Sequence, residues 1–168
     1  AMADLLEALL ERETDGRAVG WGHDSHLKRG DVSWDGEEPA LGELLDRRFG
    51  EEYCPLRTEF GSGRVRTIAK KDGGAGYDTY EVDSLGDRSL PAVFGRVADD
   101  PFLLNVERAA EDSVVAEWFG GNPDRRSVSA SVDGLSTTAE TDLPGAFDAL
   151  LFVPESSPTE LVAPLFPG

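Results

Sequence analysis

Both histidines of this 168-residue chain lie in one short segment, three positions apart. His23 and His26 enclose Asp24 and Ser25 and follow a short apolar run. An imidazole with its ordinary pKa of about 6.5 can accept or release a proton at neutral pH. We therefore expect the histidines to act as a general base or to stabilise a transition state, with water as the nucleophile and an ester or lactone as the acceptor. The alternative is a hydrogen-bonded turn without a chemical role.

Two other kinds of site could be built from the same segment. His23, Asp24 and His26 offer ligands of the nitrogen and oxygen type that zinc accepts. A complete zinc site needs about four converging ligands, and the chain has no third histidine. Ser25 could join a Ser-His-Asp triad, but adjacent residues rarely point at one another as a nucleophile and its base must. We predict no metal and no cofactor at this segment.

A strand ahead of the histidines would position them at the edge of a sheet. Residues 17–22 read as a short buried strand whose alternate side chains, with His23 as the last, point to one face. Open α/β sheets bind ligands at the carboxyl ends of their strands. We expect His23 at that rim, His26 curled back over it, and a cleft bordered by residues 28–38.

Helical and strand patterns alternate along the chain. Apolar spacing predicts helices over residues 2–13 and 39–49, the second opened by a proline. The Gly61-Ser62-Gly63 segment is expected to form a turn, and residues 70–76 a hairpin or loop. Further strands are predicted over residues 53–60, 64–69, 77–82, 102–106, 128–132 and 147–153, further helices over residues 89–97 and 107–119, and an irregular Pro-rich tail over residues 154–168.

This alternation predicts an α/β fold with three α/β/α layers. The sheet is expected to be largely parallel, with some antiparallel or hairpin additions, and residues 1–168 are expected to form a single α/β unit. Helix 2–13 should lie against the sheet. Ten apolar residues are predicted for the core: Leu6, Leu9, Leu10, Val19, Trp21, Leu45, Leu103, Leu104, Leu150 and Phe152.

The charge balance is strongly acidic. Thirty-three acidic residues against sixteen basic ones give a net charge of −17, and only three of the basic residues are lysines. Such self-repulsion destabilises a compact chain in dilute buffer, whereas about 1 M salt shortens the screening length to about 3 Å. We expect a cytoplasmic protein of an extreme halophile. The alternative is an ordinary acidic protein without salt adaptation.

The same composition excludes several classes of partner. The chain has no basic stripe that could neutralise phosphates, so we expect it to bind neither nucleic acid nor an anionic membrane. No run approaches the roughly 18 consecutive apolar residues of a membrane span. The lone Cys54 excludes an internal disulfide and a Cys-rich metal site.

Five motifs in a fixed order carry a resemblance to a known family. They are Trp21-Gly22-His23-Asp24-Ser25-His26, Leu41-Gly42 followed by residues 44–50, Phe60-Gly61-Ser62-Gly63, Phe102-Leu103-Leu104-Asn105-Val106 and Phe147-Asp148-Ala149-Leu150-Leu151-Phe152. With these spacings the chain resembles the C-terminal half of the erythromycin esterase family. Members of that family hydrolyse macrolide lactones or have unassigned substrates.

The resemblance implies a site and also a missing part. It makes His23 and His26 catalytic residues that bind or polarise the carbonyl of a small-molecule ester or lactone. The family's Gly-Glu-x-Thr-His-Gly block, thought to activate water, does not occur in this chain. We therefore expect part of a hydrolase domain that is inactive by itself, with the N-terminal half missing or a homo-oligomer completing the site. The residues predicted to bind substrate are Trp21, Asp24 and Lys28.

Two positions depart from the family pattern. Asp24 stands where asparagine is usual, and Asn105 where aspartate is usual. An exposed Asp24 would favour the charged imidazolium and weaken the histidines as bases. The alternative function is a non-catalytic binding or assembly module that retains the fold. A metal-dependent hydrolase is a third and weaker hypothesis.

Overall fold

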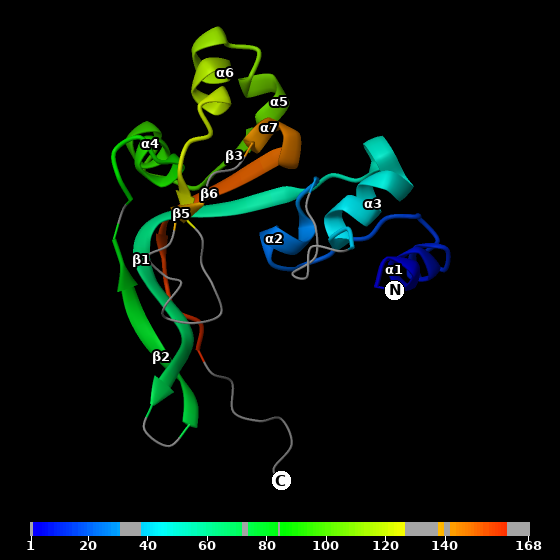
Figure 1. Cartoon of the computed structure of the whole chain (residues 1–168), viewed down its shortest axis with the longest axis horizontal. Helices are drawn as coiled ribbons and strands as arrows, with labels where there is room; N and C mark the ends of the chain where they lie inside the picture. Colours follow the sequence, from blue (N-terminus) through cyan, green and yellow to red (C-terminus); the bar gives the residue numbers. More distant parts are fainter. Residues whose placement is uncertain are drawn as a thin grey trace. The chain divides into compact units, whose positions relative to one another are not determined.

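The computed structural model describes residues 2–30, 38–71, 74–83, 85–126, 138–139 and 142–160 (Figure 1). The chain forms two compact units, each built from three stretches of sequence. The first unit comprises residues 1–58, 104–119 and 142–150, and the second comprises residues 59–103, 120–141 and 151–168. The prediction of a single α/β unit stays a prediction. No helix in the described ranges is long and apolar enough to span a membrane.

The first unit begins with two helices that pack on one another. Helix α1 (Met2–Leu10) lies beside α3 (Leu41–Phe49), as Figure 1 shows. Arg48 of α3 donates hydrogen bonds to the carboxylates of Asp4 and Glu7 on α1. Both helices were predicted, and both are shorter than expected. The predicted packing of the first helix on the sheet stays a prediction.

A single helical turn, α2 (Asp24–Leu27), packs on α3 through a glycine. A Cβ atom at Gly42 would collide with the backbone of Leu27 and Lys28, so only glycine permits this close approach. The chain after α3 continues through the 3₁₀ turn η1 (Gly50–Glu52) into strand β1 (Leu56–Lys71). Gly42 therefore sets the distance between α3 and the histidine segment.

Arg29 fixes the chain immediately after α2. Its guanidinium donates to both carboxylate oxygens of Asp148 at 2.7 and 2.9 Å, to Asp46 of α3 at 2.7 Å, and to the Tyr53 carbonyl at 2.9 Å. These bonds to Asp148 and Asp46 raise the pKa of Arg29. The Tyr53 hydroxyl donates to the carbonyl of Leu27, and burial raises the pKa of Tyr53 to about 12. The C-terminal end of α2 is thus held by other parts of the first unit.

The second unit contains a long hairpin and one capped helix. Strand β1 pairs antiparallel with β2 (Gly74–Val82), in a register from Gly63 opposite Val82 to Lys71 opposite Gly74. Helix α4 (Leu90–Val97) has Ser89 as its N-cap residue, as the sequence predicted. The Ser89 hydroxyl accepts a hydrogen bond from the Ala92 amide. The Phe94 ring of α4 packs on the rings of Phe102 and Phe152, and the three centroids lie 5.4–5.6 Å apart.

The four-stranded sheet has the order β2-β1-β6-β3, with β3 (Phe102–Asn105) at one edge and β6 (Ala149–Ser156) inside. Strand β6 runs in the direction of β1, whereas β2 and β3 run opposite to their neighbours. The contacts that fix these directions are Gly61 with Pro154, Gly63 with Ser156, Phe102 with Phe152, and Val106 with Asp148. The fold is α/β as predicted, but the prediction of a largely parallel sheet is wrong, since the sheet is mostly antiparallel.

Residues 17–22 do not form the predicted strand. They are irregular and exposed, with Val19 at 98% and Trp21 at 90% of their full accessible surface. Glycines at positions 20 and 22 leave every second position without a side chain to pack, which weakens strand pairing. His23 therefore does not lie at the end of a strand.

Two glycines predicted to make a turn lie inside a strand. The strands expected at residues 53–60 and 64–69 are one continuous element, β1. A Cβ atom at Gly61 would stand 2.6 Å from the carbonyl oxygen of Pro154, and Gly63 adopts φ +123° against Ser156 of β6. These two glycines therefore allow the backbones of β1 and β6 to approach closely.

The helix predicted at residues 107–119 is divided in two. Helices α5 (Val106–Ala109) and α6 (Ser113–Gly120) are separated by a turn in which the Asp112 carboxylate accepts the Val114 amide at 2.8 Å. Such side-chain capping favours a new helix start over a continuous helix.

The C-terminal part also differs from the sequence prediction. After α7 (Leu143–Ala146), strand β6 continues through Pro154 to Ser156, so the irregular tail begins later than residue 154. Short strands β4 (Arg125–Arg126) and β5 (Thr138–Ala139) pair antiparallel. The strand predicted at 128–132 and the last part of the tail, residues 161–168, lie outside the described residues.

The predicted core is only partly buried. Leu45, Leu150 and Phe152 are buried, whereas Leu6, Leu10 and Leu104 are half-buried. The prediction is wrong for the exposed residues Leu9, Val19, Trp21 and Leu103. Leu103 lies on the edge strand β3, where burial alternates along the strand and only one face is covered.

Candidate functional site

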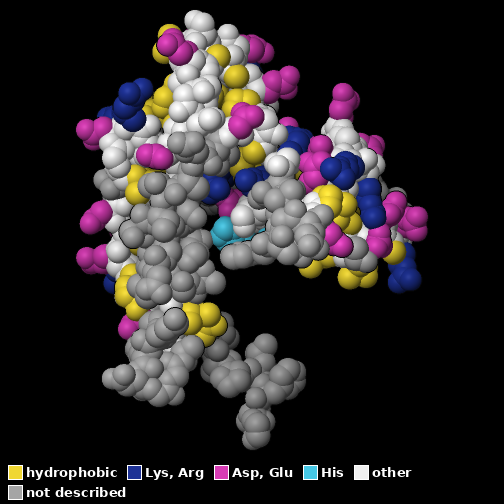
Figure 2. Space-filling view, in the orientation of Figure 1, with side chains coloured by type: hydrophobic (Ala, Val, Ile, Leu, Met, Phe, Trp, Pro, Cys, Tyr) yellow, Lys and Arg dark blue, Asp and Glu magenta, His cyan; other side chains and the backbone are white. Residues whose placement is uncertain are grey.

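Helix α2 carries both histidines on one turn. His23 is the N-cap residue of this turn, in extended backbone conformation, and Lys28 is the C-cap, with its amide on the carbonyl oxygen of Asp24. The ring centroids of His23 and His26 lie 6.2 Å apart at an interplanar angle of 69°. His26 is exposed and the His23 side chain is 46% exposed, and histidine atoms are visible on the surface in Figure 2. The predicted pair therefore exists and faces solvent.

Asp24 connects His23 to the interior of the first unit. One carboxylate oxygen, Oδ1, lies 3.0 Å from His23 Nδ1 and accepts the Ser25 amide at 2.9 Å. The other, Oδ2, pairs with the guanidinium of Arg57 on β1. Asp24 is 19% exposed. Asp24 is therefore partly buried, and the buried guanidinium of Arg57 compensates its charge.

Arg57 is the residue that sequence reasoning missed. Its side chain is 2% exposed, and its guanidinium carbon lies 5.9 Å from the centroid of the buried Phe147 ring. A buried arginine needs a carboxylate partner, and an aromatic face adds a further attraction. The sequence offered a single indication of its burial, namely that Arg57 lies within the strand predicted at residues 53–60. Alternation along β1 also buries Glu59, two positions further on.

The other predicted substrate-binding residues lie at the two sides of α2. Lys28 is half-buried next to Gly42, whereas Trp21 is exposed in the irregular segment before the helix. The cleft was expected to be bordered by residues 28–38, of which residues 31–37 lie outside the described residues. Within the described ranges, no group of three or more His, Cys, Asp or Glu side chains is placed to hold a metal ion.

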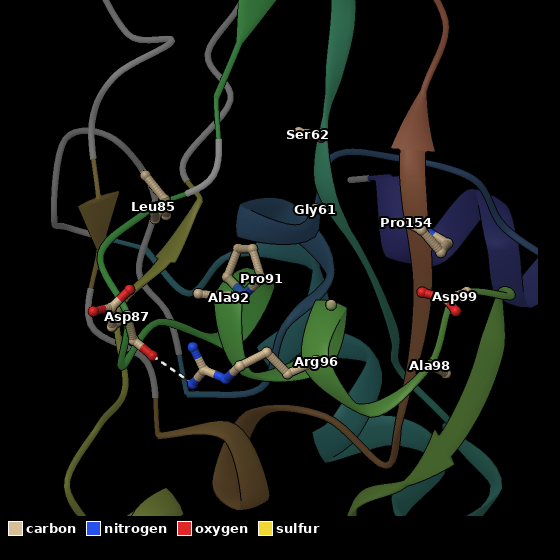
Figure 3. Close-up of a pocket in the computed structure, with 11 residues that line it drawn as sticks. Gly61, Ser62, Leu85, Asp87, Pro91, Ala92, Arg96, Ala98, Asp99 and Pro154 are labelled. Carbon is tan, nitrogen blue, oxygen red and sulfur yellow. Dashed lines mark hydrogen bonds between the residues drawn. The ribbon is translucent and has the colours of Figure 1, made fainter.

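The second unit has a cavity of its own, of about 370 Å³. Its polar side chains are those of Ser62, Asp87, Arg96 and Asp99, and small residues of α4 form part of its wall (Figure 3). Arg96 donates a hydrogen bond of 2.7 Å to the carbonyl oxygen of Asp87. This cavity was not anticipated from the sequence, and it contains neither histidine.

Comparison with known proteins gives a family match and a set of similar folds. A family model described as erythromycin esterase matches residues 1–156. A solved structure of the erythromycin esterase EreC, a histidine-to-asparagine mutant in its open conformation, is 20% identical with a TM-score of 0.67. The match covers 96% of this chain and 38% of EreC. No curated protein matches the chain.

Two further solved structures share the fold. A Bacillus cereus protein is 21% identical with a TM-score of 0.63, and a succinoglycan biosynthesis protein is 19% identical with a TM-score of 0.59. Each match covers 80% of this chain and 32% of the other protein. The chain thus spans about a third of the length of the solved structures that it matches.

Proposed function

Because the chain belongs to the erythromycin esterase family, we propose that it is part of a hydrolase domain that cleaves a small-molecule ester or lactone. The observation that carries the proposal is the exposed pair of His23 and His26 on one helical turn, with rings 6.2 Å apart. In this mechanism the pair polarises the substrate carbonyl and assists the attack of water.

The residues beside the histidines are proposed to hold the substrate. The ammonium group of Lys28, at the end of α2, can donate a hydrogen bond to the carbonyl oxygen of an ester, and the exposed Trp21 offers an apolar ring face. Asp24 belongs to the same site and touches His23 directly.

The site is proposed to be incomplete in this chain alone. The relatives of known structure are about two and a half times as long, and the sequence lacks the Gly-Glu-x-Thr-His-Gly block. Large apolar side chains also stay exposed in the first unit: Met2, Leu5, Leu9, Val19 and Trp21. Soluble proteins rarely expose many such side chains unless a partner surface covers them. We propose that the rest of the esterase domain, or a second copy of the chain, covers them.

The cellular location of the protein and its adaptation to salt are part of the same proposal. A net charge of −17 with only three lysines supports a cytoplasmic protein of an extreme halophile. The three-layer α/β/α arrangement predicted for residues 1–168 also remains part of this proposal.

The experiment is a hydrolysis assay with a macrolide lactone and a simple aryl ester. The 168-residue chain should show no activity above background, and the complete domain should be active. In the complete domain, His23→Ala or His26→Ala should lower kcat/KM by about 100-fold, the usual scale for acid–base catalysis. Arg47→Ala, on the exposed side of α3, is the control and should leave activity unchanged. Full activity after either histidine substitution would contradict the proposed role of that histidine.

Inactivity of the complete domain would favour the alternative, a non-catalytic binding or assembly module. In that case both histidine variants would still bind the same partner or ligand as the wild type.

A further inference from the structure

The second unit contains an open cavity whose lining includes neither histidine. Its volume is about 370 Å³, within the range of roughly 300–1,000 Å³ that small-molecule sites occupy. Residues of α4, β1 and β6 and of the segment before α4 line it (Figure 3). All of them belong to the second unit, so the cavity is a feature of that unit alone.

Small side chains keep this cavity open. Ala92, Gly95 and Ala98 form the wall that α4 and its C-cap provide. A Cβ atom added to Gly95 would meet no atom within 4 Å. The rings of Pro91 and Pro154 add rigid apolar surface. The cavity therefore combines free space with apolar surfaces against which the C–H groups of a ligand can pack.

Three charged side chains line the cavity, yet they do not pair with one another. They are Asp87, Arg96 and Asp99. Arg96 donates its 2.7 Å hydrogen bond to the backbone carbonyl of Asp87, as the dashed line in Figure 3 shows. Within the described part of the chain, neither carboxylate forms a hydrogen bond or an ion pair. Two carboxylates, the remaining N–H groups of Arg96 and the Ser62 hydroxyl are thus available to a ligand.

The charges of these groups decide which ligand chemistry fits. An anion would meet two carboxylates, and a cation would meet the like charge of Arg96 and leave its N–H donors unused. A hydroxyl group both donates and accepts hydrogen bonds, so it can serve a carboxylate and a guanidinium alike. Hydrogen bonds to ionised groups are also stronger than those between neutral groups. A neutral ligand with several hydroxyls therefore uses every polar group of the lining.

We propose that the cavity binds a small, neutral polyhydroxyl molecule with a single six-membered ring, such as a monosaccharide. Asp87 and Asp99 accept hydrogen bonds from its hydroxyls. Arg96 and Ser62 donate hydrogen bonds to them, and the two proline rings contact its C–H groups. Because the cavity is open to solvent, we expect a Kd in the millimolar range. This binding site does not depend on the proposed hydrolase activity.

The test is a ¹H–¹⁵N NMR titration of the 168-residue chain with neutral ring polyols. The probes are D-glucose, D-galactose, D-mannose, L-rhamnose and myo-inositol. At least one of them should shift the amide signals of Ser62, Asp87 and Arg96 in a saturable manner. The titration is run at two KCl concentrations at which circular dichroism shows a folded chain. The Kd should be nearly the same at both, because salt screens charges and the ligand carries none. Ethylammonium chloride and sodium phosphate, the charged probes, should give weaker binding than that polyol.

Two pairs of variants locate the bound molecule. Gly95→Phe fills the cavity and should abolish binding, whereas Gly95→Ala adds a single methyl group in free space and should keep the wild-type Kd. Arg96→Met should raise the Kd about tenfold, because it removes hydrogen bonds from a charged donor. Arg88→Met removes an exposed guanidinium outside the lining and should leave the Kd unchanged. If Gly95→Phe does not fold, the comparison of Arg96→Met with Arg88→Met decides the question.

The absence of saturable shifts at the cavity with all five polyols would overturn the proposal. Wild-type affinity in folded Gly95→Phe or in Arg96→Met would overturn it as well. Tighter binding of ethylammonium or phosphate than of every polyol would assign the cavity to a charged ligand instead. Because binding is measured without hydrolysis, a failed titration leaves the proposed function untouched, and inactivity of the complete domain leaves this binding site in place.

Discussion

Burial decides what a charged side chain does in this chain. Arg57 is almost fully buried beside Asp24, whereas Arg47 pairs with Glu43 along the exposed surface of α3. Exposed pairs one helical turn apart contribute about 0.3–0.5 kcal/mol, but a buried charge that loses its partner costs several kcal/mol. Two arginines in this one unit therefore have different roles.

Arg29 should contribute strongly to stability. Its guanidinium, 20% exposed, joins Asp46, Asp148 and the Tyr53 carbonyl within the first unit. Arg29→Ala would leave two carboxylates and a carbonyl without this donor, and we expect a loss of about 2 kcal/mol in the free energy of unfolding. Urea denaturation in molar KCl measures the loss. Arg47→Ala is the matched control, with an expected change below about 0.5 kcal/mol. Equal effects of the two substitutions would contradict a structural role for Arg29.

Tyr53 should make the fold sensitive to alkaline pH. Burial raises the pKa of its hydroxyl to about 12 from the ordinary value of 10.0. The unfolded chain then loses this proton at a lower pH than the folded chain, so the contribution is fully present below about pH 10 and is lost as the pH rises toward 12. Tyr53→Phe should flatten the fall in stability over this window, as followed by denaturation at several pH values. Tyr77→Phe, an exposed position on β2, should behave like the wild type. An equally steep fall in Tyr53→Phe would exclude Tyr53 as the cause.

At the scale of elements, two helical glycines should respond to alanine in opposite directions. A Cβ atom at Gly42 of α3 collides with the backbone that ends α2, whereas a Cβ atom at Gly95 of α4 meets no atom within 4 Å. Gly42→Ala should therefore cost about 1–3 kcal/mol by overpacking and displace the histidine turn. Gly95→Ala should gain about 0.5–1 kcal/mol from helix propensity. Thermal denaturation compares the two variants, and a stabilising Gly42→Ala would contradict the observed packing of α2 on α3.

The elements that the sequence predicts correctly carry their own signals. Ser89 and Pro91 mark the start of α4 because they suit a helix N-terminus independently of the rest of the fold. The predicted strand at residues 17–22 failed because a strand requires a neighbour, and an apolar pattern does not name one. Gly61 and Gly63 were read as a turn because glycine favours turns, whereas here their lack of a side chain admits the backbone of β6.

The candidate site, like the fold, could be predicted only in part from the sequence. His23 and His26 could be predicted as a pair because three positions on one helical turn place them together. The Asp24–Arg57 pair could not be predicted, because it joins residues that are 33 positions apart, on α2 and β1. Nothing in the pattern of the chain distinguishes a buried arginine from an exposed one.

At the scale of the whole molecule, charge is the dominant feature of the surface. The 33 acidic residues are scattered along the sequence, and Figure 2 shows Asp and Glu side chains spread over the visible face. The described ion pairs of the first unit use arginines and no lysine. Guanidinium groups bind carboxylates in bidentate fashion, as Arg29 binds Asp148. The scarce cations thus serve local contacts and leave the net charge of −17 uncompensated.

Stability should therefore rise steeply with salt. Repulsion among like charges destabilises the folded chain at low ionic strength, where the screening length is about 30 Å at 0.01 M. It falls to about 3 Å at 1 M, so most of the increase in Tm should occur below that concentration. Thermal denaturation across a KCl series measures this increase. Sucrose, which stabilises proteins by exclusion and does not screen charge, is the control and should lack the steep initial rise. A Tm that is constant from low to molar KCl would contradict the halophilic interpretation. A rise that begins only above 1 M would assign the effect to ion exclusion instead of screening.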